Sequence, residues 1–105
     1  MNESEKSIFL IVEFNWPMPP SKEAADAAKV LHTEVSKSDW ISSTLAGSGG
    51  LGGVQSSIWI FELANYAALD RLLTYDDSVS IAYKTFFSTV KDVKDYIKEK
   101  VIFLS

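Results

Sequence analysis

His32 is the only histidine in the 105-residue chain, and histidine is the side chain whose ordinary pKa lies nearest to neutral pH. It follows Ala28 by four residues and precedes Val35 by three, which places it at the border of the apolar stripe of a helix predicted for residues 21–38. From there it could point into a cleft between helix and sheet as a general base or a hydrogen-bond donor. The alternative is a surface or partly buried histidine without a chemical role.

Glu13 and Asn15 are the second candidates for chemistry. They share one face of a predicted strand, residues 8–16, with Phe9 and Ile11. A carboxylate and an amide on an apolar face need polar partners if they are buried. Asn15 could therefore position a substrate, and Glu13 could bind a ligand or serve as an acid of raised pKa. Alternatively, both lie at the strand end, where the sheet opens to water.

Aromatic side chains would line any cavity that the helices leave above the sheet. Trp59, Tyr83 and Phe86 are the predicted ligand-binding members of this set, and the first two add a polar group to an apolar ring. The alternative is that these rings simply fill the core. A solvent-reaching cleft larger than about 300 Å³ would favour ligand binding over a filled core.

All five glycines lie in residues 47–53, and Gly47, Gly49 and Gly52 have the spacing G-x-G-x-x-G. That motif binds a dinucleotide pyrophosphate only where a helix follows it. Here residues 54–61 are β-branched and aromatic, which predicts a strand. We therefore interpret the glycines as a hairpin turn. Because glycine loses much backbone entropy on ordering, we expect a mobile loop near the cleft mouth or a dimer partner.

Composition narrows the partners and cofactors. The formal charge is −4 and Arg71 is the only arginine, so nucleic-acid binding is not expected. The chain has no cysteine and no second histidine at ligand spacing, so no metal site and no cofactor are predicted. The polar, acidic N-terminal residues and the short apolar runs predict neither a signal peptide nor a membrane span, and they favour a cytoplasmic protein.

The apolar spacing predicts one domain over residues 1–105 with the order β-α-β-β-α-β. The second helical segment starts at an Asn65 cap, is interrupted at residues 76–78 and resumes to about residue 96. The predicted elements are strand 8–16, helix 21–38, strand 40–46, strand 54–63, helix 65–96 with its break, and strand 101–104.

Both faces of the predicted sheet are apolar. In the first strand Leu10 and Val12 point one way while Phe9 and Ile11 point the other. The helices of so short a chain can cover only one face of a four-stranded sheet. The most economical cover for the other face is a second copy of the chain, so we predict a homodimer built sheet against sheet.

Residues 58–73, a strand that ends in a polar cap and an alanine-centred helix start, resemble the corresponding stretch of antibiotic-biosynthesis monooxygenases, haem-degrading monooxygenases and NIPSNAP-like proteins. This resemblance implies a ferredoxin-like fold of the α+β class, a four-stranded antiparallel sheet with helices on one face, assembled as a dimeric α/β barrel. Relatives of this kind typically hold ligands between sheet and helices. The haem-degrading members pair an asparagine with a tryptophan and a histidine. Asn15 matches the first, but Leu72 and Ala82 occupy the other positions, so haem degradation is not expected.

Two hypotheses follow. In the first, a homodimeric α/β-barrel protein binds a small apolar or aromatic molecule between sheet and helices, and cofactor-independent oxygenase or isomerase chemistry would use Asn15 and His32 as catalytic residues. In the second, the chain is a non-catalytic, stress-related or regulatory dimerising domain whose core its own side chains fill.

Overall fold

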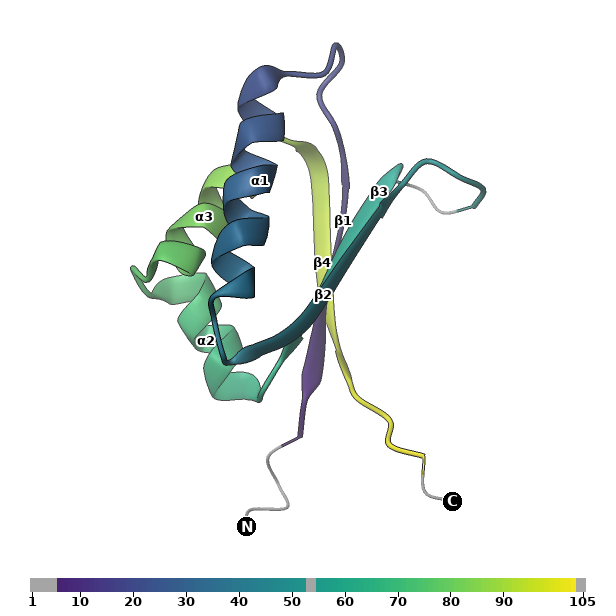
Figure 1. The fold of residues 1–105 in the computed structure, drawn as a ribbon. Coiled ribbons are helices and arrows are strands. Elements are labelled where there is room, and N and C mark those ends of the chain that lie inside the picture. The colour runs from purple at the N-terminus through teal and green to yellow at the C-terminus, as the bar shows by residue number, and fades with distance from the viewer. Residues whose placement is uncertain (1–5, 53–54, 104–105) are drawn as a thin grey trace.

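A computed structural model describes residues 6–52 and 55–103 of the chain. In this part an antiparallel sheet has the strand order β2-β3-β1-β4, and the helices lie together on one side of it (Figure 1). The elements are β1 (Ile8–Asn15), α1 (Lys22–Ser36), β2 (Ile41–Ser48), β3 (Ser57–Leu63), α2 (Tyr66–Thr74), α3 (Ser78–Phe87) and β4 (Lys91–Glu99).

The core lies between the sheet and the helices. Alternate residues of β1, including Leu10, Val12 and Phe14, are buried on this face, as are Trp59 and Phe61 of β3. The helices complete the layer with Leu31, Val35, Ala68, Leu72, Val79, Ala82, Tyr83 and Phe86. The period-2 burial along both central strands confirms the predicted division of their side chains between two faces.

Side-chain caps define where two of the helices begin. The Ser21 hydroxyl accepts a hydrogen bond from the Ala24 N–H at 3.0 Å, and the Asn65 carboxamide accepts one from the Ala68 N–H at 2.9 Å. Both caps satisfy amide groups that the first helical turn leaves unpaired. The predicted break at residues 76–78 is also present, because α2 ends at Thr74 and α3 starts at Ser78.

The secondary structure predicted for the C-terminal part of the chain is wrong. Residues 91–96, expected to be helical, belong to strand β4. Of the strand expected at 101–104, residues 101–103 lie outside any strand and Leu104 lies outside the described residues. Val93 and Ile97 have helical spacing, but β4 pairs with β1 from Ile8 opposite Glu99 to Asn15 opposite Lys91. Without β4, the backbone N–H and C=O groups along that edge of β1 would be unpaired, and this long-range pairing overrides the local pattern.

The glycine-rich segment is a hairpin connection, as predicted. It joins the antiparallel strands β2 and β3, and no helix follows it. Gly49, Gly50 and Gly52 have φ values of 75°, 79° and 86°, in the left-handed region that side chains disfavour. Gly53 and Val54, which belong to the same predicted turn and strand, lie outside the described residues. The mobility of the loop stays a prediction.

The outer face of the sheet, the face turned away from the helices, is apolar at its centre. In cross-strand register Ile11 lies opposite Ile60 and Tyr96, and Ile60 lies opposite Leu45. Ile11 and Ile60 are half-buried, while Leu45 is 62% exposed. No helix of the described residues covers this face (Figure 1).

Candidate functional site

A helix–sheet cleft of about 250 Å³ opens between α1 and the ends of β1, β2 and β3. Phe14, Trp16 and Trp59 form aromatic walls, and Ala28 of α1 closes the other side without filling the space. The remaining lining residues are Ala46, Gly47, Ser48 and Ile58. The cleft lies where a ligand site was predicted, but its volume is below the size typical of pockets for drug-sized ligands.

Trp59 and Phe86, two of the predicted ligand-binding residues, are centres of a packed aromatic layer. Their ring centroids lie 5.2 Å apart, and Trp59 stacks on Phe61 at 5.5 Å. The indole N–H of Trp59 donates to the Thr44 hydroxyl at 2.7 Å. Phe86 is fully buried, whereas Trp59 has one edge in the cleft. Trp59 can therefore contact a ligand, while Phe86 supports the wall behind it.

Tyr83 packs in the same layer, with its ring centroid 4.7 Å from that of Phe87 and 5.6 Å from that of Phe61. It is only 6% exposed. Burial raises the pKa of the Tyr83 hydroxyl above its ordinary value, and the negative charge of Asp95 adds to the shift. The phenol therefore stays protonated at physiological pH and has the character of a neutral core group.

Asn15 connects the end of β1 to β4 and to the residue that precedes β3. Its carboxamide oxygen accepts a hydrogen bond from the Ser56 N–H at 2.7 Å, and its Nδ2 donates to the Asp92 carboxylate at 3.0 Å. Asp92, the second residue of β4, has a left-handed φ of 56° and lies beside the register shift between Glu13 and Asn15. The contacts give Asn15 a clear structural task, and it is not among the residues that line the cleft.

His32 lies on α1 with an exposed side chain. It is not among the residues that line the helix–sheet cleft. The structure thus places neither predicted catalytic residue in the cleft and does not bring the two together. A catalytic role for either residue stays a prediction.

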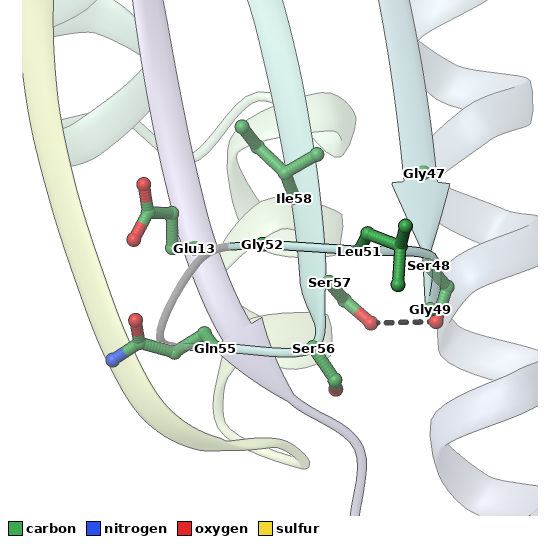
Figure 2. A pocket seen from close by; sticks show the side chains of 10 residues that line it. All are labelled: Glu13, Gly47, Ser48, Gly49, Leu51, Gly52, Gln55, Ser56, Ser57 and Ile58. Atoms are coloured by element: carbon green, nitrogen blue, oxygen red, sulfur yellow. Dashed lines mark hydrogen bonds between the residues drawn. The ribbon is translucent and has the colours of Figure 1, made fainter.

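Glu13 lies on the opposite side of the sheet, at an outer hollow of about 470 Å³ beneath the glycine hairpin (Figure 2). The Tyr96 hydroxyl donates to the Glu13 carboxylate at 3.0 Å. The lining is rich in oxygen atoms and comprises Glu13, Gly47, Ser48, Gly49, Leu51, Gly52, Gln55, Ser56, Ser57 and Ile58. The Ser48 and Ser57 hydroxyls are hydrogen-bonded to each other at 2.8 Å. The sequence did not predict this hollow, because it depends on how the hairpin lies over β1.

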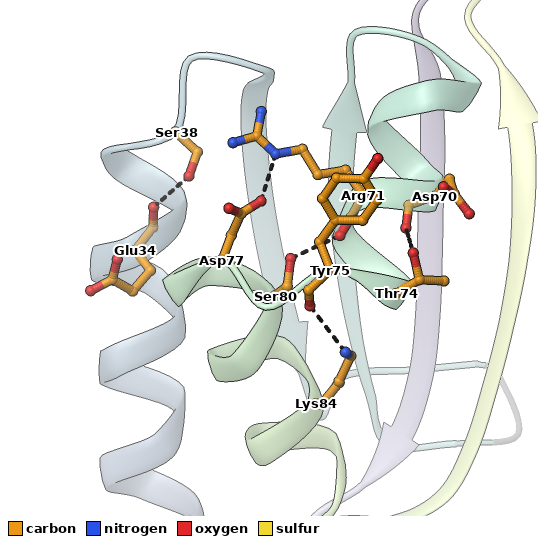
Figure 3. A network of polar contacts seen from close by, with 9 residues as sticks. All are labelled: Glu34, Ser38, Asp70, Arg71, Thr74, Tyr75, Asp77, Ser80 and Lys84. Carbon is orange, nitrogen blue, oxygen red and sulfur yellow. Dashed lines mark hydrogen bonds and ion pairs between the residues drawn. The ribbon is translucent and has the colours of Figure 1, made fainter.

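Arg71, the only arginine, connects the end of α2 to the start of α3 through hydrogen bonds (Figure 3). Its Nε donates to the Asp77 carboxylate at 2.5 Å, its guanidinium lies 4.6 Å from the centre of the Trp40 ring, and its carbonyl accepts from the buried Ser80 hydroxyl. Hydrogen bonding to Asp77 raises the pKa of Arg71. The Asp77 cap, which makes no side-chain bond to its own helix, thus ties that helix start to α2 instead.

The described residues contain no cluster of three or more histidine, cysteine or acidic side chains that could hold a metal ion. Within the same part of the chain, no helix has the length and apolar character needed to cross a membrane.

No protein-family model matches the chain, and a search of curated proteins finds no match. Solved structures do match. A dimeric ferredoxin-like protein of unknown function from Thermobifida fusca is 10% identical with a TM-score of 0.70, over 95% of this chain and 96% of that one. A Dabb family protein with a ferredoxin-like fold from Mesorhizobium loti is 14% identical with a TM-score of 0.71, over 92% and 99%. The hydroxynitrile lyase of Passiflora edulis is 11% identical with a TM-score of 0.72, over 96% and 99%.

At these identities the likeness establishes the fold. The chain has a ferredoxin-like fold, in which the second helical segment is divided into α2 and α3.

Proposed function

We propose that the chain is a single-domain homodimeric α/β-barrel protein whose subunits pack through their outer sheet faces. The proposal rests on the apolar centre around Ile11 and Ile60, which is flanked by polar contacts such as the Lys100–Glu62 ion pair of 2.8 Å. An apolar centre with a polar rim is the usual anatomy of a protein interface. It is consistent with structural neighbours from Thermobifida fusca, Bacteroides fragilis and Jannaschia that are described as dimeric.

Each subunit, in this proposal, binds a small aromatic molecule in the helix–sheet cleft. The observation that carries it is the aromatic lining of a cleft that stays open beside an otherwise filled layer. A volume of about 250 Å³ restricts the ligand to about one ring. Ser48 lines the cleft, and its hydroxyl group can hydrogen-bond to a polar substituent on that ring.

Binding is proposed here in preference to catalysis. Oxygenase or isomerase chemistry, which the resemblance to antibiotic-biosynthesis monooxygenases and NIPSNAP-like proteins implies, needs a group that moves a proton at the cleft. The lining residues of the cleft include no ionisable side chain. Activity of that kind stays a hypothesis that a substrate screen would have to support.

The second candidate, a dimerising domain with a filled core, is favoured by the aromatic layer itself. Phe14, Phe61 and Phe86 are essentially unexposed and pack ring against ring with their neighbours. In that case the cleft is only a shallow opening between α1 and the sheet.

Fluorine NMR with para-fluorophenol as the probe distinguishes the two candidates. Saturable broadening or shift of the probe signal with wild-type protein supports the binding site. Ala28→Phe, which fills the cleft, should abolish the effect, whereas Ala25→Phe on the exposed side of α1 should preserve it. Absence of saturable binding by the wild type would favour the filled-core candidate.

Analytical ultracentrifugation tests the assembly separately. The proposal expects twice the chain mass of 11.7 kDa at micromolar concentration. A species of 11.7 kDa throughout that range would refute the homodimer.

A further inference from the structure

The outer hollow presents the carboxylate of Glu13 to whatever covers it. Gln55 Oε1 is buried and has no hydrogen-bond partner, while the Gln55 Nε2 donates to the Asp92 carbonyl at 3.3 Å. The Glu13 carboxylate faces the same hollow from β1 (Figure 2). The Gln55 oxygen is enclosed by this chain's own atoms, whereas the Glu13 carboxylate can accept a charge-assisted hydrogen bond from a cationic donor.

Lys94 is the basic residue at the same level of the sheet. It lies opposite Glu13 in the β1–β4 register and therefore on the same outer face. Its side chain is exposed, and within residues 6–52 and 55–103 it forms no salt bridge, with Glu13 or any other residue. A lysine with a long flexible stem can reach an acceptor on a facing surface instead.

The sheet edges indicate how two copies would face each other. β2 and β4 are the edge strands, and they run in opposite directions because β2, β3, β1 and β4 are all antiparallel neighbours. A two-fold axis parallel to the strands brings each β4 beside the partner's β2, antiparallel, and closes both open edges of the sheet pair. An axis across the strands would instead place β4 beside the partner's β4 and β2 beside the partner's β2, and it would reverse the levels along the strands.

The same axis keeps each residue at its own level along the strands. Lys94, Glu13, Ile58 and Gly47 share one level, on β4, β1, β3 and β2 in turn. Lys94 of one copy is then carried over the end of β2 in the other, where Gly47 lines the outer hollow. Packed sheets lie about 10 Å apart, a gap that an extended lysine spans in large part.

We propose that Lys94 of the partner subunit inserts its ammonium group into the outer hollow, where the Glu13 carboxylate receives it. By symmetry the first subunit's Lys94 fills the partner's hollow. The inference rests on the proposed homodimer, and it adds how the two sheets are aligned and which charged groups favour that alignment. A charge pair in this position favours one alignment of the two sheets over others.

Mixing two charge-reversed variants tests the contact. Glu13→Lys carries two basic residues at the contact and Lys94→Glu carries two acidic ones, so each homodimer has like charges facing. A heterodimer of the two variants pairs opposite charges at both hollows. After the variants are mixed in equal amounts and equilibrated, native mass spectrometry should show a ratio of heterodimer to homodimers at least about tenfold above the ratio given by binomial pairing. If Glu13 and Lys94 interact only within one chain, the binomial proportion will be found, and that result overturns the proposal.

Two controls keep the result specific. Replacing Lys94→Glu by Lys98→Glu, on the same face of β4 at the level of Phe9, should give the binomial proportion. Glu13→Gln and Lys94→Gln, which avoid introducing new charges, should each weaken the wild-type dimer while the double variant weakens it little further. Fully additive losses would contradict the contact. A monomeric wild type would instead refute the homodimer itself.

Discussion

The helix-covered face and the outer face of the sheet are built from alternate residues of the same strands. They differ in how far other side chains of the chain cover them. Leu10 and Phe61 on the covered face are at most 1% exposed, because helix side chains pack over them. Ile11 and Ile60 on the outer face are only half-buried, although they are comparably apolar. The covered face is therefore complete within one chain, and the outer face is completed by a second one in our proposal.

The distribution of polar groups separates the two faces further. The helix–sheet cleft is bordered by aromatic rings, whereas the outer hollow is bordered by carboxylate, amide and hydroxyl oxygens. Apolar ligands suit the first and a cationic group suits the second. The following predictions test this division, beginning with the largest expected effect.

Removing a ring from the covered face should cost most. Phe86→Ala leaves a void where four aromatic neighbours meet, and the free energy of unfolding should fall by about 3–5 kcal/mol. Urea denaturation measures the change. Ile81→Ala, at a 52% exposed position on the same helix, should cost less than about 0.5 kcal/mol. Similar losses for the two variants would break the comparison.

Adding a charge to the outer face should separate the subunits while leaving the fold intact. Ile11→Lys places an ammonium group at the apolar centre, and the dimer dissociation constant should rise about a hundredfold. Sedimentation measures the mass and circular dichroism checks the fold. Ile81→Lys, on the helical surface, should keep the dimer mass. Retention of a tight dimer by Ile11→Lys would show that subunits associate through another surface.

Asn15 tests whether the end of β1 is structural. Asn15→Ala removes the hydrogen bonds to Ser56 and Asp92, and the unfolding free energy should fall by about 1–2 kcal/mol. Hydrogen exchange of the Ser56 amide should become faster in the folded state. Unchanged stability and exchange would return Asn15 to the list of candidate catalytic groups.

The smallest effect is expected at the rim of the outer face. The Lys100 ammonium and the Ser43 hydroxyl, which both donate to the carboxylate, hold the pKa of Glu62 below its ordinary value of 4.5. Because the folded-state pKa is lowered, the ionised group stabilises the fold above the unfolded value, and this contribution is lost as the pH falls through the folded value. Glu62→Gln should therefore reduce the drop in urea midpoint between about pH 7 and about pH 3. An identical drop in wild type and variant would contradict this assignment.

Much of the architecture followed from the local pattern. The alternation in residues 8–15 and 57–63 separated the two faces correctly, and the caps Ser21 and Asn65 marked the helix starts, because both signals depend on neighbours in sequence. The glycine hairpin followed from the strand after it. Trp59, Tyr83 and Phe86, predicted to line a ligand cavity, lie in one core cluster, and their ligand-binding role stays a prediction.

The sequence by itself determined the two apolar faces, and with them the need for a second cover, because side-chain direction in a strand has a fixed period. Only the tertiary structure decided that residues 91–99 form a strand, since β1 offered unpaired backbone groups that no local signal reveals. The sequence also did not predict the hydrogen bonds of Asn15, because its partners Ser56 and Asp92 lie 41 and 77 residues away. His32 had the right spacing for an inward position, but α1 left it exposed, since a border residue turns either way with a small rotation of the helix.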